Sequence, residues 1–248
     1  MTIRRARSRP FFEALEPRLL LDGAVGPIGS AGSPIVEFRG SAFYFANDGA
    51  HGAELYGVLA GNNTPSLIKD INPGPGSSYG YLLTSTSRGL LFLADSGAGT
   101  LDLWYSNGTT AGTGKIKTLN ASAGASADTL RYVQMPNING IYYFDTIDAG
   151  GHIDLYRTDT TAAGTQLLET LTTVDPAAAT LAPVQVAGKQ IVVGLQIAGA
   201  TPADNRALLW TSHGQTGDAR PVTLPVTLQS YAALTSINGT PYSYANNT

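Results

Sequence analysis

The chain has 248 residues and a net charge of −3 at pH 7, and only 13% of its residues are charged. This length can bury a large core, and the 29 Gly, the 14 Pro and the few charged residues disfavour long surface helices and favour short strands joined by turns. The mildly acidic composition argues against nucleic-acid binding, and the absence of cysteine excludes disulfides and thiolate metal sites.

Residues 1–34 are expected to lie outside the fold. The first 18 residues hold five Arg and two Glu, a balance of +3, whereas the other 230 residues have a balance of −6. The longest apolar run is 19–21, which is shorter than a signal-peptide apolar region of about 7–15 residues or a transmembrane helix of about 18 residues. The residues alone therefore predict an unstructured arm with one amphipathic turn, followed by a Gly/Pro/Ser linker at 24–34.

The apolar stretch of this arm also matches a known motif. Residues 13–21, EALEPRLLL, resemble the LEPR-XLL motif, with the same spacing between Leu-Glu-Pro-Arg and the leucines that follow. In its family this motif lies near the N-terminus of very large bacterial repeat proteins, where it is suspected of guiding export. The resemblance implies that residues 1–23 are a targeting segment and that the protein is extracellular or on the cell surface.

A repeat begins at residue 35. Its clearest copy is LDLWYSNGTTAGT at 101–113, which combines a short strand carrying an acid and an aromatic residue, a tight turn, and the start of another strand. The anchor leucine of this unit recurs in steps of 48, 52 and 54 residues, at Leu55, Leu103, Leu155 and Leu209. Recurrence at this spacing is typical of a repeat architecture.

Four short strands are expected in each repeat. The expected strands are 35–38, 42–46, 54–59 and 66–71 in repeat one (35–71); 81–86, 90–95, 101–106 and 114–119 in repeat two (81–119); 130–135, 141–147, 153–158 and 166–171 in repeat three (130–171); 182–187, 190–197, 207–212 and 221–224 in repeat four (182–224); and 232–237 and 241–245 in a partial fifth (232–248). Four strands in about 50 residues are typical of a β-propeller blade.

The predicted fold is therefore all-β, a β-propeller-like array of four-stranded antiparallel blades spanning 35–248. It has four complete repeats and half of a fifth. Either the remaining two strands belong to a longer parent chain, or segment 35–38 meets the C-terminal strands to close a ring. An uncovered sheet edge would favour the longer chain, because such edges invite aggregation.

The repeats resemble the ELWxxDGT family. The matching residues are Glu54-Leu55-Tyr56, Asp102-Leu103-Trp104 with Asn107-Gly108-Thr109, and Asp154-Leu155-Tyr156 with Asp159-Thr160. The fourth copy is degenerate, since Leu208 replaces the acid and His213 stands in the altered turn. The family looks propeller-like and occurs in large exported bacterial proteins, and the resemblance implies no common catalytic activity.

Two of the three histidines occupy equivalent loops. His51 and His152 precede the anchor strand, near Glu54 and Asp154, and would form a cation site only if they converged on one face of the propeller. Repeat two has no histidine there, and a metal site needs several donors at one point. We therefore predict no metal ligand among them.

Calcium at the turns is the outside alternative. Asp48, Asn107 and Asp159 each supply one oxygen-bearing side chain, whereas calcium takes about 6–8 oxygen ligands. Asn and Asp also stabilise tight turns through backbone N–H groups. We predict that these residues shape the turns and that the protein needs no cofactor.

One aromatic residue follows each anchor leucine. Tyr56, Trp104, Tyr156 and Trp210 hold equivalent positions, one for each repeat. Aromatic residues could form a ligand platform, but one large side chain at a fixed strand position is what packing between blades requires. We predict that they are core anchors.

The sequence offers no catalytic, cofactor or metal residues. It has no cysteine nucleophile, no Gly-x-Ser-x-Gly motif and no Gly-rich phosphate loop. We expect a non-catalytic structural or adhesive repeat module of an exported bacterial protein, with an extracellular glycan or protein as its partner and no transmembrane segment.

Two other functions remain open. A carbohydrate-active propeller, either a lectin-like binder or a glycoside hydrolase, is the first alternative, because two carboxylates from distant blades could meet. Acids about 5–9 Å apart at one mouth of the channel would favour it. A receptor-like propeller that holds a small ligand in its channel is the other.

Overall fold

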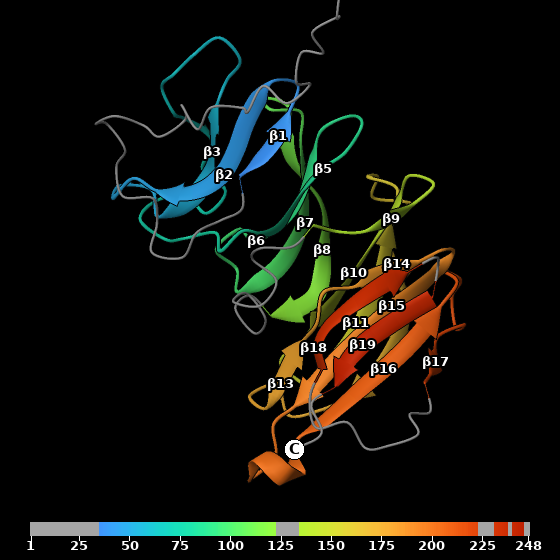
Figure 1. Ribbon diagram of the computed structural model, residues 1–248. Coiled ribbons are helices and arrows are strands. Elements are labelled where there is room, and N and C mark those ends of the chain that lie inside the picture. Colours follow the sequence, from blue (N-terminus) through green and yellow to red (C-terminus); the bar gives the residue numbers. More distant parts are fainter. Residues whose placement is uncertain (1–34, 123–133, 223–230, 238–239, 246–248) are drawn as a thin grey trace, which may run out of the picture.

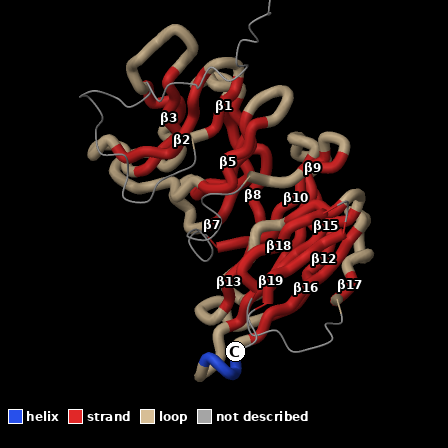
Figure 2. The backbone as a smooth tube through the Cα atoms, in the orientation of Figure 1, coloured by secondary structure: helices blue, strands red, loops and turns tan. Residues whose placement is uncertain are grey.

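The computed structural model describes residues 35–122, 134–222, 231–237 and 240–245. Within these ranges the chain consists of strands, turns and loops, and the single helix is a short 3-10 turn, η1 (Pro202–Asp204) (Figure 2). The strands form five antiparallel sheets, one for each predicted repeat (Figure 1). The all-β prediction is confirmed, and the molecule is a propeller-type array of blades.

The sheets follow the chain in order. Blade 1 contains β1 (Val36–Phe38), β2 (Ser41–Asn47), β3 (Ala53–Val58) and β4 (Ser66–Lys69). Blade 2 contains β5 (Tyr81–Ser85), β6 (Leu90–Asp95), β7 (Thr100–Ser106) and β8 (Thr113–Ser122). Blade 3 contains β9 (Asn137–Ile138), β10 (Ile141–Ile147), β11 (His152–Thr158) and β12 (Gln166–Thr173). Blade 4 contains β13 (Ala179–Leu181), β14 (Gln185–Ala187), β15 (Gln190–Ile197), β16 (Arg206–Ser212) and β17 (Arg220–Pro221). The last sheet is the hairpin of β18 (Tyr231–Ile237) and β19 (Thr240–Ala245).

Two predicted strands are wrong because of proline. The segment 130–135 was expected to be a strand, but residues 134–136 are not in one, and β9 begins only after Pro136, whose carbonyl accepts the N–H of Tyr143 at 3.0 Å. The segment 182–187 was expected to be continuous, but it is interrupted around Pro183, which has no N–H to pair. Residues 130–133 lie outside the described ranges.

The last strand of repeat four is also shorter than predicted. The expected strand was 221–224, whereas β17 covers only Arg220–Pro221 and pairs with Trp210 and Thr211. Residues 223 and 224 lie outside the described ranges.

The four anchor leucines occupy the same place in their blades. Each lies in the third strand opposite a residue of the second strand: the pairs are Leu55–Phe45, Leu103–Leu93, Leu155–Asp145 and Leu209–Gly194. All four leucines are buried. The repeat period that the sequence predicts is therefore a structural period.

Leucine and aromatic residues of the repeat face opposite neighbours. Side chains alternate across a strand, so Leu103 and Trp104 point to different sides of blade 2. Trp104 belongs to the core cluster that contains Leu55 of blade 1, whereas Leu103 belongs to the cluster that contains Tyr156 of blade 3. We conclude that each interface among blades 1–4 joins the leucine side of one blade to the aromatic side of the next, and the prediction of core anchors is confirmed for Trp104 and Tyr156.

A β-bulge recurs at one position in three blades. The register between the third and fourth strands shifts immediately after the anchor leucine, at Leu55, Leu103 and Leu155. A bulge bends its strand and increases the local twist. The outer strands of blades 1–3 are therefore bent at equivalent points, whereas the two-residue β17 of blade 4 has no bulge.

Neighbouring blades contact one another in chain order. β1 of blade 1 lies beside β5 of blade 2, β8 of blade 2 contacts β10 of blade 3, and β18 contacts β14 of blade 4 (Figure 1).

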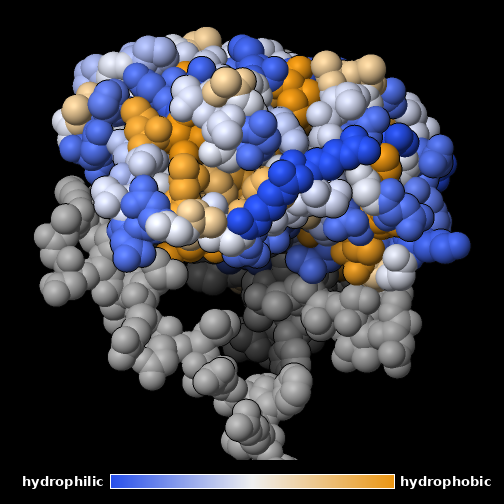
Figure 3. Space-filling model, turned by 90° about the horizontal axis from the view of Figure 1, so that it is seen from above, coloured by the Kyte–Doolittle hydropathy of each residue, from blue (hydrophilic) through white to orange (hydrophobic). Residues whose placement is uncertain are grey.

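Hydrophobic surface is scattered over the molecule. Seen from above, hydrophobic areas are separated by polar residues (Figure 3). The exposed large hydrophobic residues are Ile35, Leu59, Tyr79 and Leu167, which come from separate segments. In the part of the chain that the structure describes, no helix has the length and apolar character needed to cross a bilayer.

Candidate functional site

The acids of the repeat signature hold the third strand to the fourth. In blade 2 the hydroxyl of Thr118 donates to Asp102 Oδ1 at 2.6 Å, and in blade 3 the hydroxyl of Thr170 donates to Asp154 Oδ1 at 2.6 Å. Both acids are buried. Each carboxyl group is therefore engaged by its own blade and does not form a pair with an acid of another blade.

The equivalent acid of blade 1 has a shifted pKa. Glu54 is buried, and the N–H of Ile71, just after β4, donates to its Oε2 at 2.8 Å. Burial raises the pKa of the Glu54 carboxyl to about 7, and the hydrogen bond from Ile71 opposes that shift. Glu54 is therefore partly protonated at neutral pH, although its position is structural.

The turn residues Asn107 and Asp159 organise two equivalent turns. Asn107 Oδ1 accepts from the N–H and the hydroxyl of Thr109, at 3.1 and 2.7 Å. Asp159 Oδ1 accepts from the same two groups of Thr161, at 2.9 and 2.6 Å. The prediction that these side chains shape the turns is confirmed.

A hydroxyl pair closes each of these turns. Ser106 Oγ lies 2.6 Å from Thr113 Oγ1 in blade 2, and Thr158 Oγ1 lies 2.8 Å from Thr165 Oγ1 in blade 3. All four residues are buried. The two turns share one hydrogen-bond pattern although only some of their residues are identical.

The histidines pair with the aspartate of their own loop. His51 Nδ1 lies 2.7 Å from Asp48 Oδ2, and His152 Nδ1 lies 2.8 Å from Asp148 Oδ2. These hydrogen bonds raise the pKa of both imidazoles, and the bond with His51 holds the pKa of Asp48 well below its usual range. The partners are thus Asp48 and Asp148, and not Glu54 or Asp154, near which the histidines lie in sequence.

The third histidine lies beside Asp218. The N–H of His213 donates to Asp218 Oδ2 at 2.9 Å, and the hydroxyl of Ser212 donates to Oδ1. This aspartate closes the degenerate turn of repeat four. Within 35–122, 134–222 and the described strands that follow, no three His, Cys, Asp or Glu side chains lie close enough to hold a metal ion.

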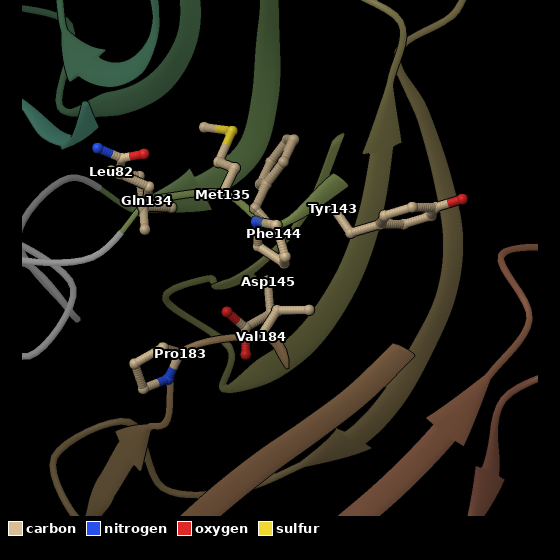
Figure 4. Close-up of a pocket in the computed structure, with 9 residues that line it drawn as sticks. Leu82, Gln134, Met135, Tyr143, Phe144, Asp145, Pro183 and Val184 are labelled. Atoms are coloured by element: carbon tan, nitrogen blue, oxygen red, sulfur yellow. The ribbon is translucent and has the colours of Figure 1, made fainter. Parts of the chain in front are cut away.

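A depression lies between β5 of blade 2, β10 of blade 3 with the segment that precedes β9, and the connection between β13 and β14 of blade 4 (Figure 4). About 190 Å³ of it is unfilled, including the part open to solvent, and no space within it is wide enough for a water molecule. Its lining residues are Leu82, Gln134, Met135, Pro136, Tyr143, Phe144, Asp145, Pro183 and Val184. The lining is mainly apolar, with one acid.

Asp145 is the unusual residue of this depression. Its side chain lies on the side of Pro183 and Val184 (Figure 4), it is 1% exposed, and its Oδ2 has no hydrogen-bond partner among the described residues. Burial raises the pKa of the Asp145 carboxyl to about 8. At neutral pH the carboxyl is therefore mostly protonated, because burial disfavours its charged form.

Asp145 stands out when the second strands of the four repeats are compared. Its equivalents in the other blades are Phe45, Leu93 and Gly194, which pair with the anchor leucines in the same way. An acid within the apolar run IYYFDTI therefore replaces a core residue. Aligning the second strands of the repeats would have identified it.

No protein-family model matches the chain, and no curated protein sequence matches it. A crystal structure of a puromycin hydrolase mutant complexed with PGG is similar, with a TM-score of 0.50 and 12% identity over 86% of this chain and 35% of that one. TolB from Acinetobacter baumannii has a TM-score of 0.44 and 16% identity over 77% of this chain and 44% of that chain.

At such identities the likeness concerns the fold alone. The chain spans about a third of the length of the puromycin hydrolase that it matches. The likeness to the puromycin hydrolase agrees with the blade topology and with the assignment of a β-propeller-type fold.

Proposed function

We propose that this chain is a non-catalytic structural or adhesive repeat module of an exported bacterial surface or extracellular protein. The proposal rests on the hydrogen bonds that the acids of the repeat make. Glu54, Asp102 and Asp154 are buried and accept hydrogen bonds within their own blades, so the recurring acid serves the architecture. Rigid stacked blades leave the loops to contact an extracellular glycan or protein.

A carbohydrate-active propeller would behave differently: a lectin would bind glycans, and a hydrolase would also cleave them. Glycan-array binding and turnover by the full chain, with and without a calcium chelator, separate these functions. We expect no glycan turnover, and a melting temperature that the chelator changes by less than about 1 °C, because the turn side chains of Asn107 and Asp159 are hydrogen-bonded within their own turns. Calcium-dependent glycan cleavage would contradict the proposal.

Export is proposed from residues 1–23 and is tested separately. A fusion of residues 1–34 to a reporter that is active only outside the cytoplasm should give signal in a bacterial host. The matched control replaces Leu19, Leu20 and Leu21 by serine and should lose the signal. Equal signal from both fusions would show that the motif does not direct export.

A further inference from the structure

We propose that segment 11–21 of the N-terminal arm docks on the outer side of blade 1, in the place that a preceding blade would occupy. The outer side is the side of the blade 1 sheet that faces away from blade 2. Its side chains include Glu37, Ala42, Tyr44, Ala46, Tyr56 and Val58. Segment 11–21 lies outside the described residues, whereas the four strands of blade 1 are all described.

The second strand shows that no blade covers the outer side. Tyr44 and Ala46 of β2 are partly exposed there. Their equivalents in β6 are Phe92 and Ala94, which are 0% exposed and belong to the core cluster between blades 1 and 2. Identical strand positions are therefore fully buried where a blade packs on them and partly open on blade 1.

The third strand shows the same difference. The aromatic residue of the repeat joins a core cluster in blades 2, 3 and 4, as Trp104, Tyr156 and Trp210. Tyr56 and Val58 of blade 1 are buried, yet neither belongs to any of the three clusters. A stacked array needs a cap over an apolar terminal side, so the outer side is a surface that requires an occupant.

Charge favours the arm as that occupant. The exposed acids at the outer side are Glu37 on β1 and Asp48 in the loop after β2. Burial, together with the nearby Asp48, raises the pKa of the Tyr56 phenol, which places this acid at the outer side. Lys69 lies opposite Leu55 and so belongs to the side that faces blade 2. The first 18 residues of the arm hold five Arg and two Glu, so they complement these acids.

The apolar residues of the arm suit the outer side as well. Segment 11–21, FFEALEPRLLL, contains two Phe and four Leu among its charged residues. Burying one such side chain against apolar surface contributes about 1.5–3 kcal/mol. Two or three of them are enough to hold a segment that is already tethered beside its site.

The connection from the arm to blade 1 is long enough. Residues 22–34 join the segment to β1, which is an edge strand of its sheet. A Gly-rich connection of this length spans about 20 Å on average and at most about 45 Å, whereas a sheet of four strands is about 14 Å wide. Tethering also gives an effective concentration of the order of millimolar, so a weak contact suffices.

A second copy of the chain is a less suitable occupant. In a two-fold contact, two outer sides that both carry Glu37 and Asp48 would face each other. The leucine side of a blade would match better, but in the described part of the chain the next blade covers this side in blades 1–3, and β18 lies against blade 4.

The test is limited proteolysis of the full chain with trypsin, with each cut assigned by mass spectrometry. Trypsin cuts after Arg18, within the segment, and after Arg7, which precedes it. We expect the cut after Arg18 to be at least about tenfold slower in the native chain than in a Phe11→Ser/Phe12→Ser chain, because docking protects this bond. The cut after Arg7 should proceed at the same rate in both chains.

Matched variants of blade 1 test the surface itself. Tyr44→Lys places a charge of the arm's own sign on the outer side and should speed the cut after Arg18 at least about tenfold. Asn63→Lys adds the same charge to the exposed loop between β3 and β4 and should leave this cut as in the native chain. Ala46→Lys serves in place of Tyr44→Lys if the latter chain does not fold, as judged by thermal unfolding.

Two proteolysis results would overturn the proposal: equal rates after Arg18 in the native and Phe11→Ser/Phe12→Ser chains, and undiminished protection in a folded Tyr44→Lys chain. Sedimentation velocity should show a monomer. A dimer that Tyr44→Lys dissociates would show that a second copy occupies the outer side instead. None of these results depends on export, which the reporter fusion tests separately.

Discussion

Thr160 occupies, with a φ of 76°, the turn position that Gly108 occupies in blade 2 with a φ of 90°. A β-branched residue is strained in this left-handed region, whereas glycine is not. We predict that Thr160→Gly stabilises the protein by about 0.5–1 kcal/mol. Gly108→Ala should destabilise it by more than about 1 kcal/mol, because the new Cβ would lie 2.9 Å from the ring of Phe43. Chemical denaturation of both variants measures these differences, and a destabilised Thr160→Gly chain would contradict the strain argument.

The dependence of stability on pH follows from opposing pKa shifts. Burial raises the pKa of Glu54 to about 7 and that of Asp145 to about 8, so the native state holds these protons when the unfolded chain has lost them. Their contribution is fully present below about pH 4 and disappears as pH rises towards 8. The lowered pKa values of Asp48 and Asp148 act in the other direction and cost stability below about pH 4.

We therefore predict that the melting temperature is highest near pH 4 and falls as pH rises from there to 8, with the His51 pair also weakening in the upper part of this range because its imidazole has a raised pKa. Asp145→Leu should flatten this fall and should be more stable than the native chain at pH 8 by about 1–3 kcal/mol. Thermal unfolding followed across pH 4–9 measures both effects. A maximum near pH 8 would contradict the assigned direction of the shifts.

Outer strands connect neighbouring blades at equivalent positions. Lys117 Nζ donates to the carbonyl of Thr165 at 2.6 Å, from blade 2 to blade 3. Glu169, in the same position of the next blade, accepts from the N–H of Ala219 at 2.9 Å, from blade 3 to blade 4. Both residues lie opposite an anchor leucine, so one strand position provides a donor in one blade and an acceptor in the next.

We predict that Glu169→Leu lowers the free energy of unfolding by about 0.5–1.5 kcal/mol, because the N–H of Ala219 loses its acceptor. Glu169→Gln should retain most of the stability, since its amide oxygen can accept the same bond. Lys117→Met keeps the aliphatic stem and should lose about 0.5–1 kcal/mol, since the lysine is exposed. Urea denaturation checks the series, and equal losses for Glu169→Leu and Glu169→Gln would contradict the role of the acceptor.

The strands of this protein are largely readable from its sequence, for a physical reason. Strands buried on both faces, such as β6 and β15, are continuous apolar runs between turn residues. The misplaced strands are those whose pairing depends on proline at 136 and 183, which a pattern of apolar residues does not reveal. The burial of Asp145 was not predicted, because whether its carboxyl finds a hydrogen-bond partner depends on residues distant in sequence. The pairing of His51 with Asp48 likewise depends on the geometry of the loop.

Stability is expected to vary along the array. Leu103 is fully buried in the cluster that joins blades 2, 3 and 4, whereas Leu209 lies in a small cluster with Ala207. We predict that Leu103→Ala costs about 3–5 kcal/mol and Leu209→Ala about 2 kcal/mol, because the surroundings of Leu209 are less extensive.

Guanidinium denaturation of both variants, with the native chain as reference, checks this ranking. Hydrogen exchange should likewise show the slowest amides in β6, β7, β10 and β11, which lie in the middle of the array. Equal losses for the two leucines would show that the blades unfold as one unit without a weaker end.

Leucine on one side and an aromatic residue on the other give every blade two unlike surfaces, and that asymmetry gives the stack a direction. Contacts between unlike surfaces are heterologous, so the same contact can be repeated from blade to blade in one direction, whereas a reversed blade would bring leucine against leucine. Duplication of one whole repeat therefore preserves the interfaces on both of its sides. An array built in this way can gain or lose complete repeats while each remaining pair of neighbours keeps the same kind of contact.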